Sequence, residues 1–285
     1  MKQIILTVFI LASLTAQDDF VGETFDRGSI NYADRTIQAT GIGFIPVNVI
    51  NAGQARRSAM RIAKQDALRQ LIEIVNGVNV TSETTVSGAM FDDVIKTQVQ
   101  GAIRGARKVG EPKYLSDTSV EVVYEVSMNN ISRALLPMAE RAPVLSYESV
   151  TATGTAAVAA GQGGGAAAAP ASGGVTGIII DGSGLGLRPA MSPRILNQSG
   201  TVLYGPGQYD RDYAAANGVV GYAKTLGQAK ADTRVQGNPL VLRGASASGT
   251  AKTDVIISNA DAGKLVSAGR SAGLLQDCRI MFVLN

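Results

Sequence analysis

The stretch Thr36-Ile-Gln-Ala-Thr-Gly-Ile-Gly-Phe-Ile45 predicts a β-strand, and helical periodicity follows it from about Ala52 to Val75. The clearest strand of the chain comes later, from Ser119 to Met128, where apolar and polar residues alternate. This alternation indicates a strand with one buried face and one face in water. These three segments form the centre of a first domain.

Four further elements complete this domain. We expect a strand at Val78–Val86, a weaker helix at Phe91–Ile103, a strand broken by Pro112 at Lys108–Leu115, and a closing helix at Ile131–Glu140 that Asn129 or Asn130 caps. The order is strand, helix, strand, helix, strand, strand, helix. It predicts an α+β sandwich over residues 36–145.

The predicted long helix has two different sides. Its apolar side contains Ala55, Ala59, Ile62, Ala63, Ala67, Leu71, Ile74 and Val75, and Gly77 suits a left-handed C-cap. The other side carries Arg56, Arg57, Arg61 and Lys64, together with Arg69. This basic side is either a solvated surface or a face that contacts anionic lipid or an acidic partner. Residues 56, 57, 61 and 64 are our candidate interaction face.

The N-terminus predicts export. Met1-Lys2 is positively charged, residues 3–14 are mostly apolar, and small Ala16 precedes polar residues, which is typical of a cleaved signal peptide over residues 1–16. Residues 17–35 are acidic, and we expect an extended, loosely ordered arm. No later segment has the length of a transmembrane helix. We therefore expect an exported protein of the periplasm, the outer-membrane surroundings or the cell surface.

An Ala- and Gly-rich segment divides the chain. Residues 146–174 contain Gly163-Gly-Gly165 and Ala166-Ala-Ala-Ala169, a composition typical of a flexible linker. Residues 175–285 then predict a second mixed α/β domain. Its expected elements are strands at Val175–Ile180, Ile195–Tyr204 with an internal turn, Asn238–Leu242 with an edge-type Pro239, Thr253–Ser258 and Cys278–Leu284, one helix or two short helices at Tyr209–Asp232, and a helix from Ser258 to about Ala268. The fold class is α+β with two domains.

One glycine-rich stretch resembles a nucleotide-binding turn. Asp181-Gly-Ser-Gly-Leu-Gly-Leu187 follows a strand, but a phosphate-binding turn must open directly into a helix. Pro189, Ser192 and Pro193 follow too closely for a helix to begin. The stretch therefore predicts a tight turn between strands.

The composition argues against most catalytic and metal chemistry. The chain has no histidine and one cysteine, Cys278, which excludes a cysteine zinc cage and an intramolecular disulfide. Cys278 lies in an apolar run, so we expect a buried thiol. The formal net charge of +3 is small and scattered, and it does not favour nucleic acid. We expect no cofactor and no metal site.

Aspartates are the remaining candidates for catalysis. Asp181 and Asp254 both flank apolar strands and meet at a sheet edge in one arrangement, as a carboxylate-dependent hydrolase requires. The other candidates are Asp210, Asp212 and Asp261. Helix capping and turn formation explain each of these residues more simply, and we expect no enzymatic activity.

Several separated blocks resemble one known family. Thr40-Gly-Ile-Gly43, the helix segment from Ala55 to Leu71, the block from Ile74 to Thr84, and Asp92-Asp-Val-Ile95 are similar to the N-terminal domain of flagellar assembly protein T and to the twenty-kilodalton surface lipoproteins. The resemblance covers about residues 36–140. It implies a non-catalytic envelope protein that assembles with others, such as a component of a periplasmic ring or disc around the flagellar motor. The chain lacks the lipid-anchor cysteine of the lipoproteins.

These observations lead to a main hypothesis and two alternatives. The main one is an exported structural or assembly protein of the bacterial cell envelope, flagellum-associated, that forms a homo-oligomer and contacts other envelope or flagellar proteins. The first alternative is a secreted or surface module for binding or adhesion. The second alternative is the hydrolase that uses the aspartates named above.

Overall fold

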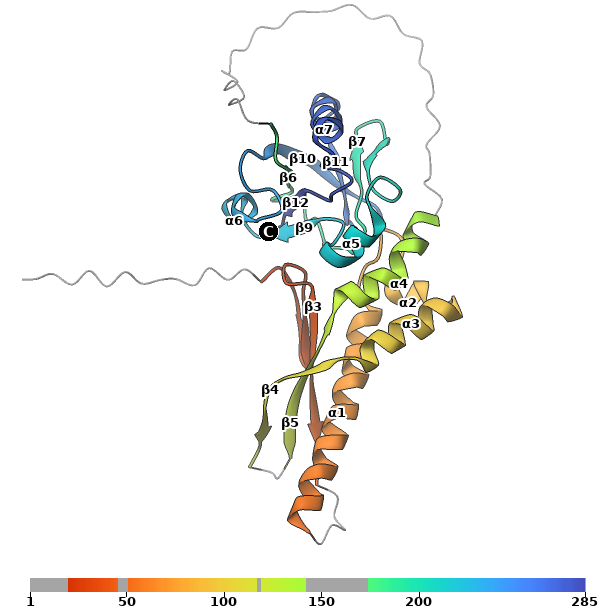
Figure 1. Cartoon of the computed structure of the whole chain (residues 1–285), viewed down its shortest axis with the longest axis vertical. Helices are drawn as coiled ribbons and strands as arrows, with labels where there is room; N and C mark the ends of the chain where they lie inside the picture. The colour runs from red at the N-terminus through yellow and green to blue at the C-terminus, as the bar shows by residue number, and fades with distance from the viewer. Residues whose placement is uncertain (1–19, 46–50, 117–118, 142–173, 285) are drawn as a thin grey trace, which may run out of the picture.

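The computed structural model describes residues 20–45, 51–116, 119–141 and 174–284 (Figure 1). The chain is an α+β protein with two domains, and each domain is built on its own sheet. The expected signal peptide and most of the expected linker lie outside the described residues. We call the part before residue 142 the N-terminal unit and the part after residue 173 the C-terminal unit.

The N-terminal unit is a five-stranded antiparallel sheet in the order β1-β2-β3-β5-β4. The strands are β1 (Gly22–Phe25), β2 (Gly28–Asn31), β3 (Thr36–Gly43), β4 (Arg107–Tyr114) and β5 (Val120–Ser127). The predicted strands at Thr36, Lys108 and Ser119 are confirmed. β4 passes through Pro112, and its pairing with β5 shifts register between Val109 and Lys113. An edge strand tolerates this proline because one side of its backbone has no strand partner.

The expected loose arm is wrong over residues 22–31. This segment is the β1–β2 hairpin, and β2 continues the sheet by pairing with β3. Its acidic residues face away from the core, whereas Val21, Ile30 and Tyr32 are buried. The acidic residues of this segment indicated a loose arm, but its few buried apolar residues attach the hairpin to the sheet.

The predicted long helix is α1 (Ala52–Asn76), which packs on β3 and β5. The buried stripe of α1 begins with four alanines, so the helix and the sheet approach each other closely. At Gly41 of β3, an added Cβ would collide with the carbonyl oxygen of Ala63. Ile62 was expected in this stripe but is 42% exposed. Gly77 was expected to be left-handed, but it has φ −81° and ψ −11° because its N–H still bonds the Ile74 and Val75 carbonyls.

The expected strand at Val78–Val86 is wrong. This segment is a loop with one isolated bridge, Asn79 to Thr85, and it leads into α2 (Val86–Ala89) and then α3 (Asp93–Arg104). Val78 and Val80 are buried, as the alternation predicted, but the residues that bury them include those of the C-terminal unit. The alternation of apolar and polar residues at 78–86 therefore indicated correctly which side chains are buried, but these residues do not pair in a sheet.

The closing helix is α4 (Met128–Arg141), and it begins directly after β5. Asn129 and Asn130 therefore lie in its first turn and are not the caps that we expected. The backbone N–H of Asn129 donates to Ser127 Oγ at 3.2 Å. Figure 1 places α4 between the N-terminal sheet and the C-terminal unit, and its contacts with helix α5 (Arg211–Asn217) join the two.

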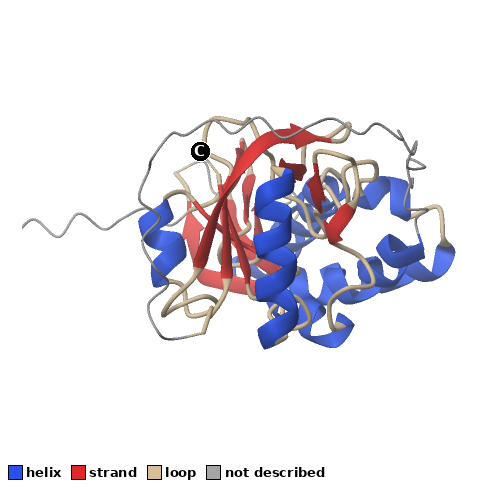
Figure 2. Cartoon of the chain, turned by 90° about the horizontal axis from the view of Figure 1, so that it is seen from above, coloured by secondary structure: helices blue, strands red, loops and turns tan. Residues whose placement is uncertain are grey.

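The C-terminal unit is a seven-stranded mixed sheet in the order β8-β7-β11-β10-β6-β12-β9. The strands are β6 (Ile178–Asp181), β7 (Ile195–Asn197), β8 (Val202–Tyr204), β9 (Gly221–Ala223), β10 (Leu240–Ser248), β11 (Asp254–Ile257) and β12 (Ile280–Val283). Its helices are α5 (Arg211–Asn217), α6 (Leu226–Ala231) and α7 (Asn259–Ala272). Figure 2 shows strands of this sheet between helices.

Most of the predicted C-terminal elements are confirmed. Residues 209–232 form two short helices, but the strand β9 between them was missed because it has only three residues. Pro239 was expected on an edge strand, yet β10 is interior. The proline precedes Leu240, so the sheet loses no N–H donor. The glycine turn at 182–186 opens into no helix, and Gly184 and Gly186 take φ values of 78° and 63°.

Candidate functional site

The junction between the two units contains the most unusual arrangement of polar groups in the described structure. Here the loop of residues 78–86 is joined to the C-terminal unit through its backbone. Met191 N–H donates to the Asn79 carbonyl at 2.9 Å, Ser192 N–H to the Val80 carbonyl at 2.8 Å, and Ala251 N–H to the Ser82 carbonyl at 3.0 Å. The two units therefore share hydrogen bonds of the kind that normally lie inside one sheet.

A buried carboxylate lies at the centre of this contact. Asp254 is 1% exposed, and its Oδ2 accepts from Ser82 Oγ at 2.7 Å and from Arg194 Nε and Nη2 at 2.8 and 2.6 Å. Its Oδ1 accepts from the backbone N–H of Arg194 at 2.9 Å. Both oxygens are therefore bound, and Ser82 of the N-terminal unit completes the group. We call Ser82, Arg194 and Asp254 the junction triad.

The other candidate carboxylates have local roles. Asp210 accepts from the N–H of Tyr213 at 2.7 Å as the N-cap of α5, and Asp261 binds Lys264 Nζ at 2.8 Å in the first turn of α7. Asp212 lies exposed in the first turn of α5. A hydrogen bond with the Ser183 side chain lowers the pKa of Asp181, against the opposing effect of burial.

The structure does not bring Asp181 and Asp254 together. Asp181 ends β6 and is in register with Arg243 of β10, whereas Asp254 begins β11 opposite Ser248. Arg243 and Ser248 are five residues apart on one strand, which corresponds to roughly 16 Å. The pair of carboxylates that the hydrolase hypothesis needs is therefore not formed by these two residues.

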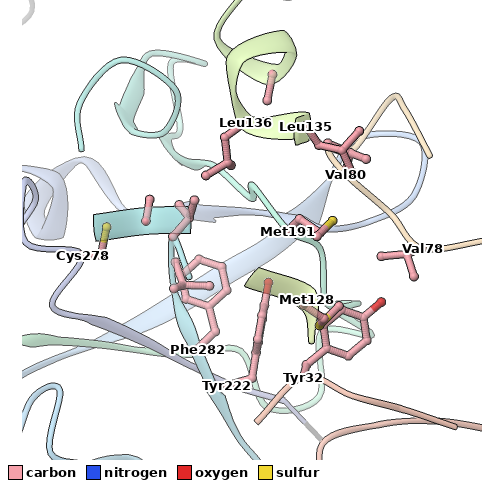
Figure 3. Packing of buried hydrophobic residues seen from close by; sticks show 14 of the residues in the cluster. Tyr32, Val78, Val80, Met128, Leu135, Leu136, Met191, Tyr222, Cys278 and Phe282 are labelled. Carbon is pink, nitrogen blue, oxygen red and sulfur yellow. The ribbon is translucent and has the colours of Figure 1, made fainter. Parts of the chain in front are cut away.

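Apolar packing also crosses the junction. Figure 3 shows Val78, Val80, Leu135 and Leu136 of the N-terminal unit in the same cluster as residues of the C-terminal unit. The rings of Tyr32 and Tyr222 meet edge to face with centroids 5.8 Å apart, and Tyr222 meets Phe282 at 6.1 Å. One continuous core runs through both units, so the two domains pack directly against each other.

Cys278 belongs to the same cluster. It is fully buried, as the sequence predicted, and burial raises the pKa of its thiol. A raised pKa disfavours the thiolate, which is the reactive form. The residue serves as packing, and its φ of 49° places it at the sharp entry into β12.

A second group of arginines lies at the junction beside the C-terminal end of α5. Arg35, in the turn between β2 and β3, donates through Nη2 to the Ala215 carbonyl at 3.3 Å and to Ser132 Oγ at 3.2 Å. Arg234 donates to the carbonyls of Gly218 and Cys278 at 3.1 and 2.8 Å, and to that of Asn217. The carbonyls of Ala215, Asn217 and Gly218 lie at the C-terminal end of α5, where a helix leaves its last carbonyls without an intrahelical partner.

The two arginines are close enough to affect each other. Burial, and then the positive charge of Arg234, lower the pKa of Arg35 to about 10. Arg35 adopts φ 55°, an uncommon backbone conformation for a residue with a side chain, and its guanidinium packs against Gly218. The fold therefore holds a strained arginine beside a like charge.

These arginines line a cavity between the units. A polar cavity of about 230 Å³ is bordered by Arg35, Arg234 and Arg279, and also by Tyr32, Ala33, Tyr213, Asn217, Val220, Gly221, Tyr222, Asp232 and Thr233. A second cavity of about 560 Å³ shares Ala33, Tyr222 and Asp232 with the first. We call the two together the junction cleft. Clefts between domains are common ligand sites.

The candidate interaction face lies elsewhere, on the exposed side of α1. Arg56, Arg57, Arg61 and Lys64 are exposed, as predicted. Arg56 lies over the ring of Tyr114 at 5.6 Å, and Lys64 over that of Tyr124 at 5.7 Å. Two of the four cations therefore stack on aromatic rings of the sheet, an arrangement that keeps them close to the surface.

Within the described ranges, no group of three His, Cys, Asp or Glu side chains is arranged to hold a metal ion. No described helix is both long enough and apolar enough to cross a membrane.

Sequence reasoning missed the residues of the junction cleft. Arg35, Arg234 and Arg279 are far apart in the chain, and each lies among residues with no motif. Of the junction triad, the sequence indicated Asp254 as a candidate. Nothing in the sequence pointed to Ser82 or Arg194. The unusual φ of Arg35 is a property of the folded turn and cannot be seen in the sequence.

Comparison with known families concerns the C-terminal unit. A family model described as Treponema pallidum Tp0624, second domain, matches residues 177–285, which contain the whole seven-stranded sheet. No curated protein matches the chain.

Proposed function

We propose that this chain is an exported, non-catalytic structural or assembly protein of the bacterial cell envelope, and that it is a flagellum-associated component of a periplasmic ring or disc. The observation that supports this most is the junction triad. The aspartate best placed to be catalytic by sequence, Asp254, instead has both oxygens occupied by groups that join the two units. A protein that transmits contacts through an assembly benefits from such a fixed connection.

The surface of α1 supports the same proposal. The fixed body presents the four cations of the candidate interaction face on a 25-residue helix. Figure 1 shows α1 extending away from the C-terminal unit, so its far end is accessible to a partner. Near that end, Phe44 and Tyr114 are each 60% exposed. Basic side chains beside exposed aromatic rings suit an acidic surface on a second copy or on another envelope protein.

Light scattering of the purified chain from residue 17 onward, over a concentration series, tests the assembly. We expect a discrete oligomer, and we expect Arg57→Glu with Arg61→Glu to weaken it. Lys230→Glu, in the unrelated helix α6, is the control. A wild-type chain that stays monomeric at all concentrations, and also with envelope extract, would contradict the proposal. Deletion of the gene tests the flagellar part, because unchanged motility and motor structure would exclude it.

The junction cleft favours a second candidate, a secreted or surface binding module. A cavity lined by polar side chains from both units is a feature of a binding protein as well as of a scaffold. Screening against envelope polysaccharides and glycans separates the two candidates. Binding of a soluble glycan by a monomeric protein would favour the module.

A further inference from the structure

We propose that the junction cleft binds an oxyanion, a phosphate or carboxylate group carried by a larger polar molecule. This inference does not depend on the proposed assembly function, because the cavity lies between the two units and its lining contains no residue of α1. It is based on charge, on unused hydrogen-bond donors and on the shape of the cleft.

The charge of the smaller cavity is unbalanced. Three guanidinium groups border it, from the β2–β3 turn, from the loop after α6 and from the residue before β12. Among the described residues, Arg35, Arg234 and Arg279 each bond to carbonyl or hydroxyl oxygens, and none is paired with a carboxylate. Asp232 is the one acidic residue in the lining, and its Oδ1 accepts from the backbone N–H of Arg234.

The bonds to helix-end carbonyls use only part of the available donors. Arg35 Nη1 is buried and makes no hydrogen bond with the described residues. Arg279 is exposed, and its side chain makes a single hydrogen bond with the described residues, a long one from Nη1 to the Thr176 carbonyl at 3.3 Å. A guanidinium offers five N–H donors in a planar fork that matches a phosphate or carboxylate. The Nη2 and Nε groups of Arg279 therefore remain available to an anion.

A buried positive charge without an anion is costly, and structures normally compensate it. At the junction triad the compensation is a carboxylate of the chain itself. In the junction cleft it is a set of carbonyl dipoles, each of which carries only a partial charge. A bound oxyanion supplies the missing negative charge and relieves the repulsion between Arg35 and Arg234.

The dimensions of the cleft define the ligand class. The cavity of about 230 Å³ beside the arginines is large enough for an oxyanion and too small for a drug-sized molecule. The adjoining cavity of about 560 Å³ accepts the rest of the molecule, and its lining includes the small residues Ala223, Gly227 and Ala231. Tyr213, Asn217 and Thr233 supply neutral polar groups next to the arginines.

The experiment measures binding of inorganic phosphate and citrate to the chain from residue 17 onward, which contains every described residue. Thermal unfolding is followed in sodium phosphate, sodium citrate and sodium chloride at equal ionic strength, and isothermal titration gives the dissociation constants. We expect phosphate or citrate to raise the midpoint of unfolding above that in chloride. Tighter binding of phosphate indicates a ligand with a phosphate group, and tighter binding of citrate indicates one with a carboxylate group.

Arg279→Gln is the informative variant, because its exposed side chain contributes little to folding. We expect its dissociation constant for the anion to be at least ten times larger than that of the wild type, because a charge-assisted hydrogen bond is lost. Arg104→Gln, at an exposed arginine in the last turn of α3, is the matched control and should bind as the wild type does. The proposal is wrong if neither anion exceeds chloride, or if Arg279→Gln binds as tightly as Arg104→Gln.

Discussion

The two arginine contacts at the junction differ in what balances their charge. Arg194 meets the carboxylate of Asp254 through three hydrogen bonds, and Ser82 Oγ donates a fourth to the same carboxylate. Arg35 and Arg234 meet carbonyl oxygens at the end of α5 and lie close to each other. The first contact is complete within the chain, whereas the second has positive charge in excess.

This difference separates a structural role from a binding role. A complete buried ion pair gains nothing from a ligand, but loss of either partner leaves an isolated buried charge. A contact in which arginines meet only carbonyl oxygens contributes less to stability, and a bound anion can stabilise it further. The following changes test this distinction, from the largest expected effect to the smallest.

Asp254→Ala should have the largest effect. It leaves the guanidinium of Arg194 without its carboxylate, and we expect the free energy of unfolding to fall by about 3–5 kcal/mol. Urea denaturation measures the loss. The double variant Arg194→Met with Asp254→Leu removes both charges and should be clearly more stable than Asp254→Ala. Equal stability of the two variants would show that the cost does not arise from an unpaired charge.

Gly218→Ala tests the backbone beneath the second contact. Gly218 has φ 89° and ψ 147°, and an added Cβ would lie 3.2 Å from Arg35 Nε. We expect a loss of about 2 kcal/mol, because side chains rarely adopt this conformation. Gly101→Ala is the matched control, since a Cβ at this exposed position in α3 meets nothing within 4 Å. It should stabilise the protein by up to about 1 kcal/mol.

Arg35→Met should have a smaller effect than Asp254→Ala. It removes the bonds to Ala215 and Ser132, but it also removes a half-buried charge that lies beside Arg234. We expect a net loss of about 1 kcal/mol in the free energy of unfolding. The same denaturation experiment measures it. A loss as large as that of Asp254→Ala would mean that the two contacts are equally structural, and the distinction would fail.

Asp66 provides the smallest test, on a partly exposed cluster. Burial raises the pKa of this carboxyl, but hydrogen bonds from the Ile42 backbone, Arg69 and Arg27 outweigh burial and lower it overall. A lowered folded pKa means that the stabilisation is present above the ordinary value near 4 and is lost as pH falls through the folded value. The advantage of the wild type over Asp66→Asn should therefore shrink between pH 5 and roughly pH 2. A constant difference would contradict this assignment.

The sequence predicted the elements that depend on local pattern. The helix at Ala52 and the strand from Ser119 follow from periodicity, because a repeat of 3.6 or of two residues places apolar side chains on one face. The same logic failed at Val78–Val86, where the alternation is real but the buried side chains contact another unit. It also failed for the β1–β2 hairpin, where acidic residues surround short apolar positions.

By itself the sequence determined the fold class, most helices and strands, the buried position of Cys278 and the tight glycine turn after β6. Only the tertiary structure decided that the two units share one core, that Asp254 joins them and that three arginines line one cleft. The physical reason is separation along the chain. Ser82 and Asp254 are 172 residues apart, and Arg35 and Ala215 are 180 apart. Local preferences carry no information about contacts of that range, which depend on how two packed surfaces meet.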